Sequence, residues 1–140
     1  MSSYPEYLTA PMKQDLMSVG FQDLTAASSV AELLDNTEGT TLLVVNSVCG
    51  CAAGAARPGV KMAIKEAVKK PTNLATVFAG VDKEATSKVR EYLMPYPPSS
   101  PAIALFKNGE LVHFVERHQI EGRPAHIIAE HLKEVFEEHC

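Results

Sequence analysis

Two cysteines separated by a single glycine, Cys49-Gly50-Cys51, are the residues of this 140-residue chain best suited to chemistry. A thiolate is a nucleophile, and two neighbouring thiols can form and break a disulfide. Because Gly50 has no side chain, the backbone can turn tightly enough for the two sulfurs to approach each other, where a side chain would hinder the approach. The pattern favours reversible dithiol–disulfide chemistry.

The segments on either side predict how the pair is positioned. Thr41–Val45 is a short apolar run, typical of a strand buried on both faces, and the alanine-rich segment after Cys51 is a strong helix former. The cysteines should therefore lie at a helix N-terminus, where unpaired N–H groups and about half a positive charge favour the thiolate. We predict that Cys49, which precedes the helix, is more exposed and more acidic than Cys51.

Inert buried thiols and a metal site are the alternatives for these two cysteines. Inert thiols explain poorly why two cysteines straddle a glycine. Zinc calls for four ligands in recognisable pairs. The remaining candidate ligands are scattered, and they are Cys140, His113, His118, His126, His131 and His139. We predict no metal, assign no histidine a catalytic role, and leave Cys140 open between an idle terminal thiol and a third redox centre.

The composition indicates one ordinary globular domain spanning residues 1–140, with 46% hydrophobic residues and a net charge of −4. No basic patch favours nucleic acid, and no run approaches the roughly 18 apolar residues that span a bilayer. Met1–Tyr7 lacks the basic and then apolar pattern of a secretory signal. We expect a cytoplasmic protein, a monomer or weak dimer, without nucleic-acid or membrane partners. In that reducing compartment, cysteines serve catalysis or metal binding rather than structural disulfides.

Periodicity and turn signals predict an alternation of helices and strands. In chain order these are a helix at 11–20 capped by Thr9, a possible edge strand at 21–25, a helix opened by a capping box at 29–32, a strand at 41–45, a helix at 52–70, a strand at 74–79, a helix capped by Asp82, strands at 102–106 and 111–115 joined by Asn108-Gly109, and a last helix opened at 122–124. The helix after the cysteines has Val60, Ile64, Ala67 and Val68 on one side, and Pro58 should kink it and separate an active-site segment from the remainder. The proline-rich segment 94–101 must be a loop.

This order, with thiols after the central strand and a proline before the hairpin, resembles the thioredoxin fold. The resemblance implies an α/β protein with a central mixed β-sheet flanked by helices, here with an extra N-terminal helix. In that fold the matching proline is cis and lies beside the active-site disulfide. We therefore expect a cis Ser100–Pro101 bond, packing of this loop against Cys49, and substrate binding by Gly50, Ser100 and Pro101.

A closer resemblance is to the bacilliredoxin family, and it runs through nearly the whole chain. It is carried by residues 44–54, which contain the Cys-Gly-Cys motif, and by residues 77–80, 98–101 and 139–140. It implies a thiol-disulfide oxidoreductase that removes bacillithiol from protein mixed disulfides. Cys49 would be the attacking thiol and Cys51 the resolving thiol. The partners would be bacillithiolated proteins and bacillithiol, the latter as thiol co-substrate, with no other cofactor.

The spacing of the cysteines leaves two further functions open. A disulfide closed over one intervening residue forms a smaller, more strained ring than that of a Cys-x-x-Cys pair, and it is more readily reduced. Such a pair reduces stable disulfides poorly but suits disulfide isomerisation. The alternative from another class is a non-catalytic module in which Cys49 and Cys51, joined by Cys140 or a histidine, hold a metal.

Overall fold

The computed structural model describes residues 4–140. Residues 1–3, part of the Met1–Tyr7 segment that lacks the pattern of a secretory signal, lie outside that range. The helices are α1 (Glu6–Met17), α2 (Ala27–Asn36), the π-helical η1 (Ala52–Ala56), α3 (Arg57–Glu66), α4 (Lys83–Leu93), α5 (Arg117–Ile120) and α6 (Ala125–His139). The strands are β1 (Gln22–Asp23), β2 (Thr40–Asn46), β3 (Asn73–Phe78), β4 (Ala102–Lys107) and β5 (Glu110–Val115). None of the helices within 4–140 is long and apolar enough to cross a membrane.

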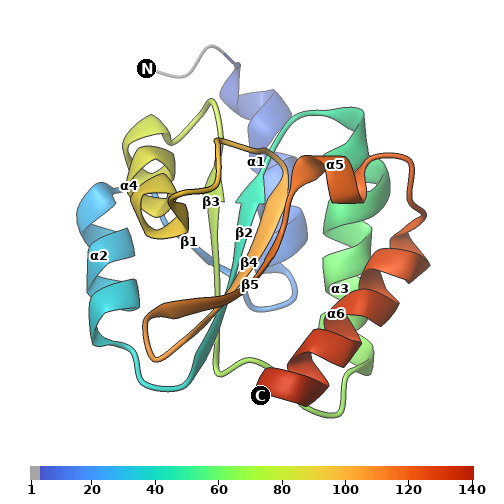
Figure 1. Cartoon of the computed structure of the whole chain (residues 1–140). Helices are drawn as coiled ribbons and strands as arrows, with labels where there is room; N and C mark the ends of the chain where they lie inside the picture. Colours follow the sequence, from blue (N-terminus) through green and yellow to red (C-terminus); the bar gives the residue numbers. More distant parts are fainter. Residues whose placement is uncertain (1–3) are drawn as a thin grey trace.

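The strands form one five-stranded mixed sheet in the order β1-β3-β2-β4-β5. Strand β3 is parallel to β1 and β2, whereas β4 is antiparallel to both β2 and β5. Helices α2 and α4 cover one face of the sheet, and α3 and α6 cover the other (Figure 1). The mixed sheet between helices and the edge position of β1 confirm the predictions.

The central strand β2 is buried at all seven positions because both faces of the sheet are covered. Successive side chains of a strand point to opposite faces. Accordingly, Leu42 and Val44 join the core beneath α3 and α6, whereas Leu43 and Val45 join the core beneath α2 and α4. This double burial explains the continuous apolar run and holds the strand end that leads to the cysteines in a fixed place.

Close packing of α3 against α6 depends on a glycine. A Cβ atom built at Gly59 would lie 2.7 Å from the Cβ of Ile128, closer than real Cβ contacts allow. A larger residue would therefore push α6 away from the helix that follows the cysteines.

Several predicted boundaries near the N-terminus are wrong. Helix α1 begins at Glu6, five residues before the expected start, so Pro11 lies inside it and Thr9 is a buried helical residue rather than a cap. Pro11 is exposed, where the carbonyl group that loses its donor can be hydrated. Helix α2 begins at Ala27 without a side-chain cap, so the expected capping box at 29–32 is absent.

Two predictions later in the chain also differ from the structure. Helix α3 ends at Glu66, four residues before the expected end, so Val68 lies beyond the helix and is 95% exposed. Asp82 occupies the N-cap position of α4 but makes no capping bond, because its carboxylate accepts a charge-assisted bond from Lys13 Nζ at 2.7 Å. The short helix α5 was not predicted. The Asn108-Gly109 hairpin is confirmed, with φ of 51° and 83° as a type I′ turn requires.

Candidate active site

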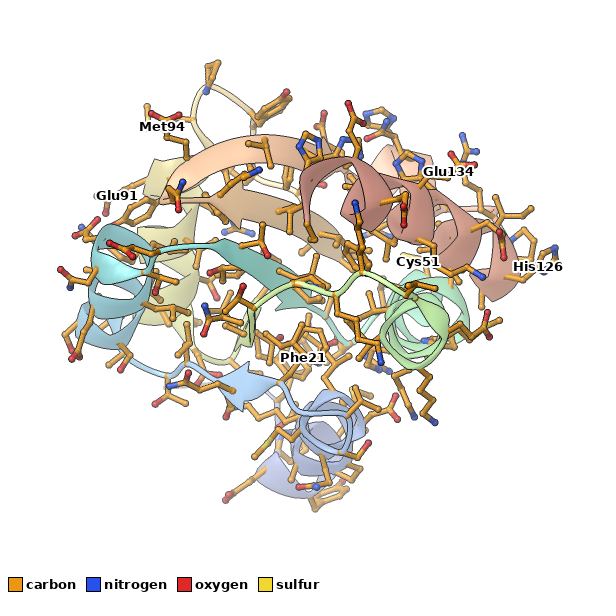
Figure 2. All side chains as sticks on the ribbon, turned by 90° about the horizontal axis from the view of Figure 1, so that it is seen from below. Phe21, Cys51, Glu91, Met94, His126 and Glu134 are labelled. Carbon is orange, nitrogen blue, oxygen red and sulfur yellow. The ribbon has the colours of Figure 1, made fainter. Side chains whose placement is uncertain are left out.

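Two residues, Ser47 and Val48, separate the end of β2 from Cys49, and the cysteines begin the next helical segment. The carbonyl oxygen of Cys49 accepts bonds from the amides of Ala52 at 3.1 Å and Ala53 at 3.3 Å, so the first turn closes on Cys49. Cys51, labelled in Figure 2, is the residue immediately before η1. The two Sγ atoms are 2.6 Å apart and both thiols are free.

The glycine between the cysteines is less constrained than we expected. Gly50 is exposed, and a Cβ atom built there would meet nothing within 4 Å. The expectation that a side chain would hinder the approach of the sulfurs therefore finds no steric support in this dithiol state. Its exposure leaves the backbone open to a bound substrate.

Pro58 does separate the active-site segment from the rest of the helix, as predicted. Residues Ala52–Ala56 are π-helical, and the regular helix α3 begins at Arg57 with Pro58 in its first turn. Pro58 has no N–H group to donate to the carbonyl of Gly54, and its ring crowds that carbonyl. The wider π-turn accommodates this loss and gives the segment after the cysteines its own geometry.

The two thiols differ in acidity in the predicted direction. Burial opposes ionisation of Cys49, but hydrogen bonds from the Cys51 thiol, the Ala52 amide, the Ser47 hydroxyl and the Cys51 amide bring its pKa below the ordinary value. Burial, together with the hydrogen bond to Cys49 and the Cys49 charge, raises the pKa of Cys51. Both residues are half-buried, so the predicted difference in exposure stays a prediction.

A polar network that the sequence analysis missed holds the backbone just before the cysteines. Arg57 Nη1 donates to Asn46 Oδ1 at 2.9 Å and to the Ser47 carbonyl at 2.8 Å. Asn46 also accepts from the Ser47 amide at 2.8 Å, and its Nδ2 donates to the Met12 carbonyl at 3.1 Å. Ser47 Oγ accepts from the Cys49 amide at 3.2 Å. A sequence signal existed in the polar pair Asn46-Ser47, which ends an apolar strand.

The proline-rich loop has the predicted backbone geometry, because the Ser100–Pro101 bond is cis. A second cis bond, Met94–Pro95, was not predicted. Pro101 is buried and Ser100 is half-buried, so only Ser100 offers surface to a ligand. Direct packing of this loop against Cys49 stays a prediction.

Arg117, also missed from sequence, binds that loop, and its charge acts on the thiols. Its amide donates to Ser99 Oγ at 2.7 Å, its Nη1 donates to the Ser100 carbonyl at 3.2 Å, and its Nε pairs with Glu121. The bond to Glu121 and the charges of both cysteines raise the pKa of Arg117. An open groove of about 430 Å³ runs along this side of the molecule. It is lined by Pro97, Pro98, Ser99, Ser100, Glu116, Arg117, His118 and Glu121.

The remaining candidate ligands show no arrangement around the cysteines. His113 and His131 pair with each other, with their Nε2 atoms 2.8 Å apart, and His126 lies on the outer surface of α6 (Figure 2). Cys140 is exposed at the end of α6. Within residues 4–140, no group of three or more His, Cys, Asp or Glu side chains is placed to hold a metal ion. The role of Cys140 stays open.

Known proteins share this fold. The solved structure of oxidised mitochondrial thioredoxin 3 from Saccharomyces cerevisiae superposes with a TM-score of 0.56 at 16% identity, covering 89% of this chain and 98% of that one. At this identity the likeness shows the fold alone. The family described as "Disulphide isomerase" matches residues 4–140. A thioredoxin fold with paired thiols at the start of a helix defines a thiol–disulfide oxidoreductase.

Two curated relatives identify the family. A bacilliredoxin from Cytophaga hutchinsonii is 61% identical over 135 residues, covering 96% of this chain and 98% of that protein. A bacilliredoxin from Bacillus cereus is 51% identical over 142 residues, covering 99% of each. This chain belongs to the bacilliredoxin family.

Proposed function

We propose that this protein removes bacillithiol from protein mixed disulfides, with Cys49 as the attacking thiol. The observation that carries the proposal is the acidic Cys49 thiol, whose sulfur lies 2.6 Å from that of Cys51. A thiol of lowered pKa is more often present as the attacking thiolate, while its neighbour of raised pKa is more often protonated. The family of named bacilliredoxins supports bacillithiol as the thiol that is transferred.

In the first step the Cys49 thiolate attacks the bacillithiol sulfur of the mixed disulfide. A new bond forms between Cys49 and bacillithiol, the old disulfide breaks, and the substrate protein leaves as a thiolate that takes up a proton. One disulfide replaces another in this step, so no oxidant or reductant is consumed. Arg117, which binds the Ser100 carbonyl and whose charge acts on both thiols, would place a positive charge near the leaving thiolate.

In the second step the adduct is released by one of two thiols. Cys51 can lose its proton and attack Cys49, which forms the Cys49–Cys51 disulfide and frees bacillithiol; two external thiols then reduce that disulfide. Alternatively, a free bacillithiol attacks the adduct and leaves as bacillithiol disulfide. We propose that Gly50 and Ser100 present their backbone to the bound mixed disulfide and that Pro101 shapes the loop from within.

Removal of bacillithiol from a modified test protein, with free bacillithiol supplied, tests the proposal. Cys49→Ala should lose activity because the first step fails. Cys51→Ala should keep part of it because free bacillithiol can release the adduct. Cys140→Ala serves as the matched cysteine control and should act like wild type. Activity in Cys49→Ala together with its loss in Cys51→Ala would refute the assignment of roles.

Disulfide isomerisation is the second candidate function, favoured by the description of the matched family. It needs a thiolate at Cys49 and no bacillithiol. Recovery of activity by a ribonuclease with scrambled disulfides, without added bacillithiol, measures it. Isomerisation by Cys51→Ala at the wild-type rate, with no bacillithiol removal by any form, would favour this candidate over the first.

A further inference from the structure

Arg57 is a buried cation with an incomplete counterion. Its exposed fraction is 5%, so its charge is largely removed from water. Its nearest carboxylate is Asp15, whose Oδ2 lies 3.6 Å from Nε, beyond close hydrogen-bond contact. The other oxygen of Asp15 accepts from Lys61 Nζ at 2.6 Å. Two cations therefore share one carboxylate, and the cluster keeps a net positive charge.

The Arg57 guanidinium lies against the segment that carries the attacking thiol. The Arg57 guanidinium binds the Ser47 carbonyl at 2.8 Å, two residues before Cys49. Two further charged groups act on the thiols, Arg117 of α5 and Glu121, the residue that follows α5. Arg117 is paired with Glu121 and is exposed, so its charge is partly cancelled and screened. Arg57, by contrast, is buried and only partly paired.

We propose that Arg57 is a positioning residue that sets the reactivity of Cys49, because the Cys49 thiolate completes the counterion that Asp15 supplies only in part. Burial lowers the pKa of Arg57, and the charges of Asp15 and Cys49 raise it, which is the reciprocal sign of the same attraction. The proposal rests on the proposed function only in taking Cys49 as the reacting thiol.

The proposal predicts opposite effects for the two members of the cluster. Arg57→Met removes the positive charge, so the thiolate becomes less favourable and Cys49 reacts more slowly below neutral pH. Asp15→Asn removes the competing negative charge, so Arg57 and Lys61 are left with less compensation and the thiolate becomes more favourable. If the cluster had a purely structural role, both substitutions would lower the reactivity of Cys49 or change it without a consistent sign. The charge mechanism instead predicts a lower reactivity for Arg57→Met and a higher one for Asp15→Asn.

Alkylation by iodoacetamide, followed at Cys49 by peptide mass spectrometry across pH, is the experiment. At about pH 6, Arg57→Met should react on the order of tenfold more slowly than wild type, the effect of about one pKa unit. Asp15→Asn should react several-fold faster. Arg57→Lys keeps the charge without both hydrogen bonds and should fall between wild type and Arg57→Met. The pH of half-maximal rate should shift upward for Arg57→Met and downward for Asp15→Asn.

Two variants on the opposite layer of the molecule are matched controls. Asp35→Asn removes one carboxylate from α2, where Asp35 accepts only from Tyr92 at 2.7 Å, and Arg90→Met removes one partly buried cation from α4. Both should react like wild type. If Arg57→Met does not fold, as circular dichroism would show, Asp15→Asn decides alone, because Asp15 has a side chain 36% exposed.

An unchanged or slower rate in Asp15→Asn would overturn the proposal, as would a wild-type pH profile in a folded Arg57→Met. The probe is iodoacetamide, so the outcome does not depend on bacillithiol. If bacillithiol removal failed while these shifts appeared, the proposed function would be wrong and the role of Arg57 would stand.

Discussion

Helix α1 is joined to the rest of the molecule by two charged clusters of opposite balance. In the first, Lys13 Nζ binds Asp82 Oδ2 at 2.7 Å and Asp23 Oδ2 at 3.2 Å. One cation thus meets two carboxylates, and all three side chains are less than a fifth exposed, at 18%, 13% and 17%. This cluster ties α1 to β1 and to the start of α4.

In the second cluster one carboxylate, Asp15, meets two cations, Arg57 and Lys61. It ties α1 to α3 on the cysteine side of the molecule. A structural role is enough to explain the first cluster, because the charge of Lys13 is fully compensated by two carboxylates. The second is left positive beside a thiol, which is a poor arrangement for stability and a suitable one for holding a thiolate.

Lys13→Met should have the largest effect of the changes that separate the two clusters. It leaves Asp23 and Asp82 without their cation, and breaking a buried pair costs about 3 kcal/mol of unfolding free energy. Urea denaturation measures this, and iodoacetamide reactivity of Cys49 should stay at the wild-type level. Adding Asp82→Asn should recover part of the lost stability. A slowed Cys49 in folded Lys13→Met would contradict the division between the clusters.

The same variant has a defined pH dependence. Burial lowers the pKa of Lys13, but its bonds to Asp82 and Asp23 outweigh burial and raise it. A raised pKa means that the stabilisation is fully present below the ordinary lysine value of about 10.5 and is lost as pH rises through the folded value. The stability gap between wild type and Lys13→Met should therefore stay constant across the neutral range and narrow only in strong alkali.

Arg117→Met should have the smallest effect and sharpens the contrast between a buried and an exposed cation. Because Arg117 is exposed and paired with Glu121, its loss should slow Cys49 alkylation by only about twofold to threefold. Salt at about 1 M should abolish that deficit and leave the deficit of Arg57→Met in place. Equal salt sensitivity in the two variants would mean that the Arg57 charge is not shielded from solvent as the structure indicates.

The parts predicted correctly from sequence are those that local chemistry decides. An apolar run before Cys49 and alanines after Cys51 predicted strand, thiols and helix, and Asn108-Gly109 predicted the hairpin. Asp82 shows the limit: its position as an N-cap was correct, but its side chain binds Lys13, 69 residues away in sequence. A cap is a local preference, and a charged partner brought by the fold outweighs it.

The candidate site divides in the same way. The thiols and the cis proline have recognisable local patterns. Arg57 belongs to the site only because the fold places it against Asn46 at the end of β2 and places Asp15 of α1 beside it. In sequence, Arg57 is one arginine at the end of an alanine run, and its burial could not be foreseen. Arg117 depends likewise on an unpredicted four-residue helix.

The most direct test of the central claim is to locate the bacillithiol after a single transfer. Cys51→Ala, which lacks the resolving thiol, is mixed with a bacillithiolated test protein in the absence of free bacillithiol, and the products are mapped by peptide mass spectrometry. The account predicts one bacillithiol on Cys49 and an equal amount of released protein thiol. An adduct on Cys140, or a substrate that keeps its bacillithiol while Cys49 remains a free thiol, would contradict it.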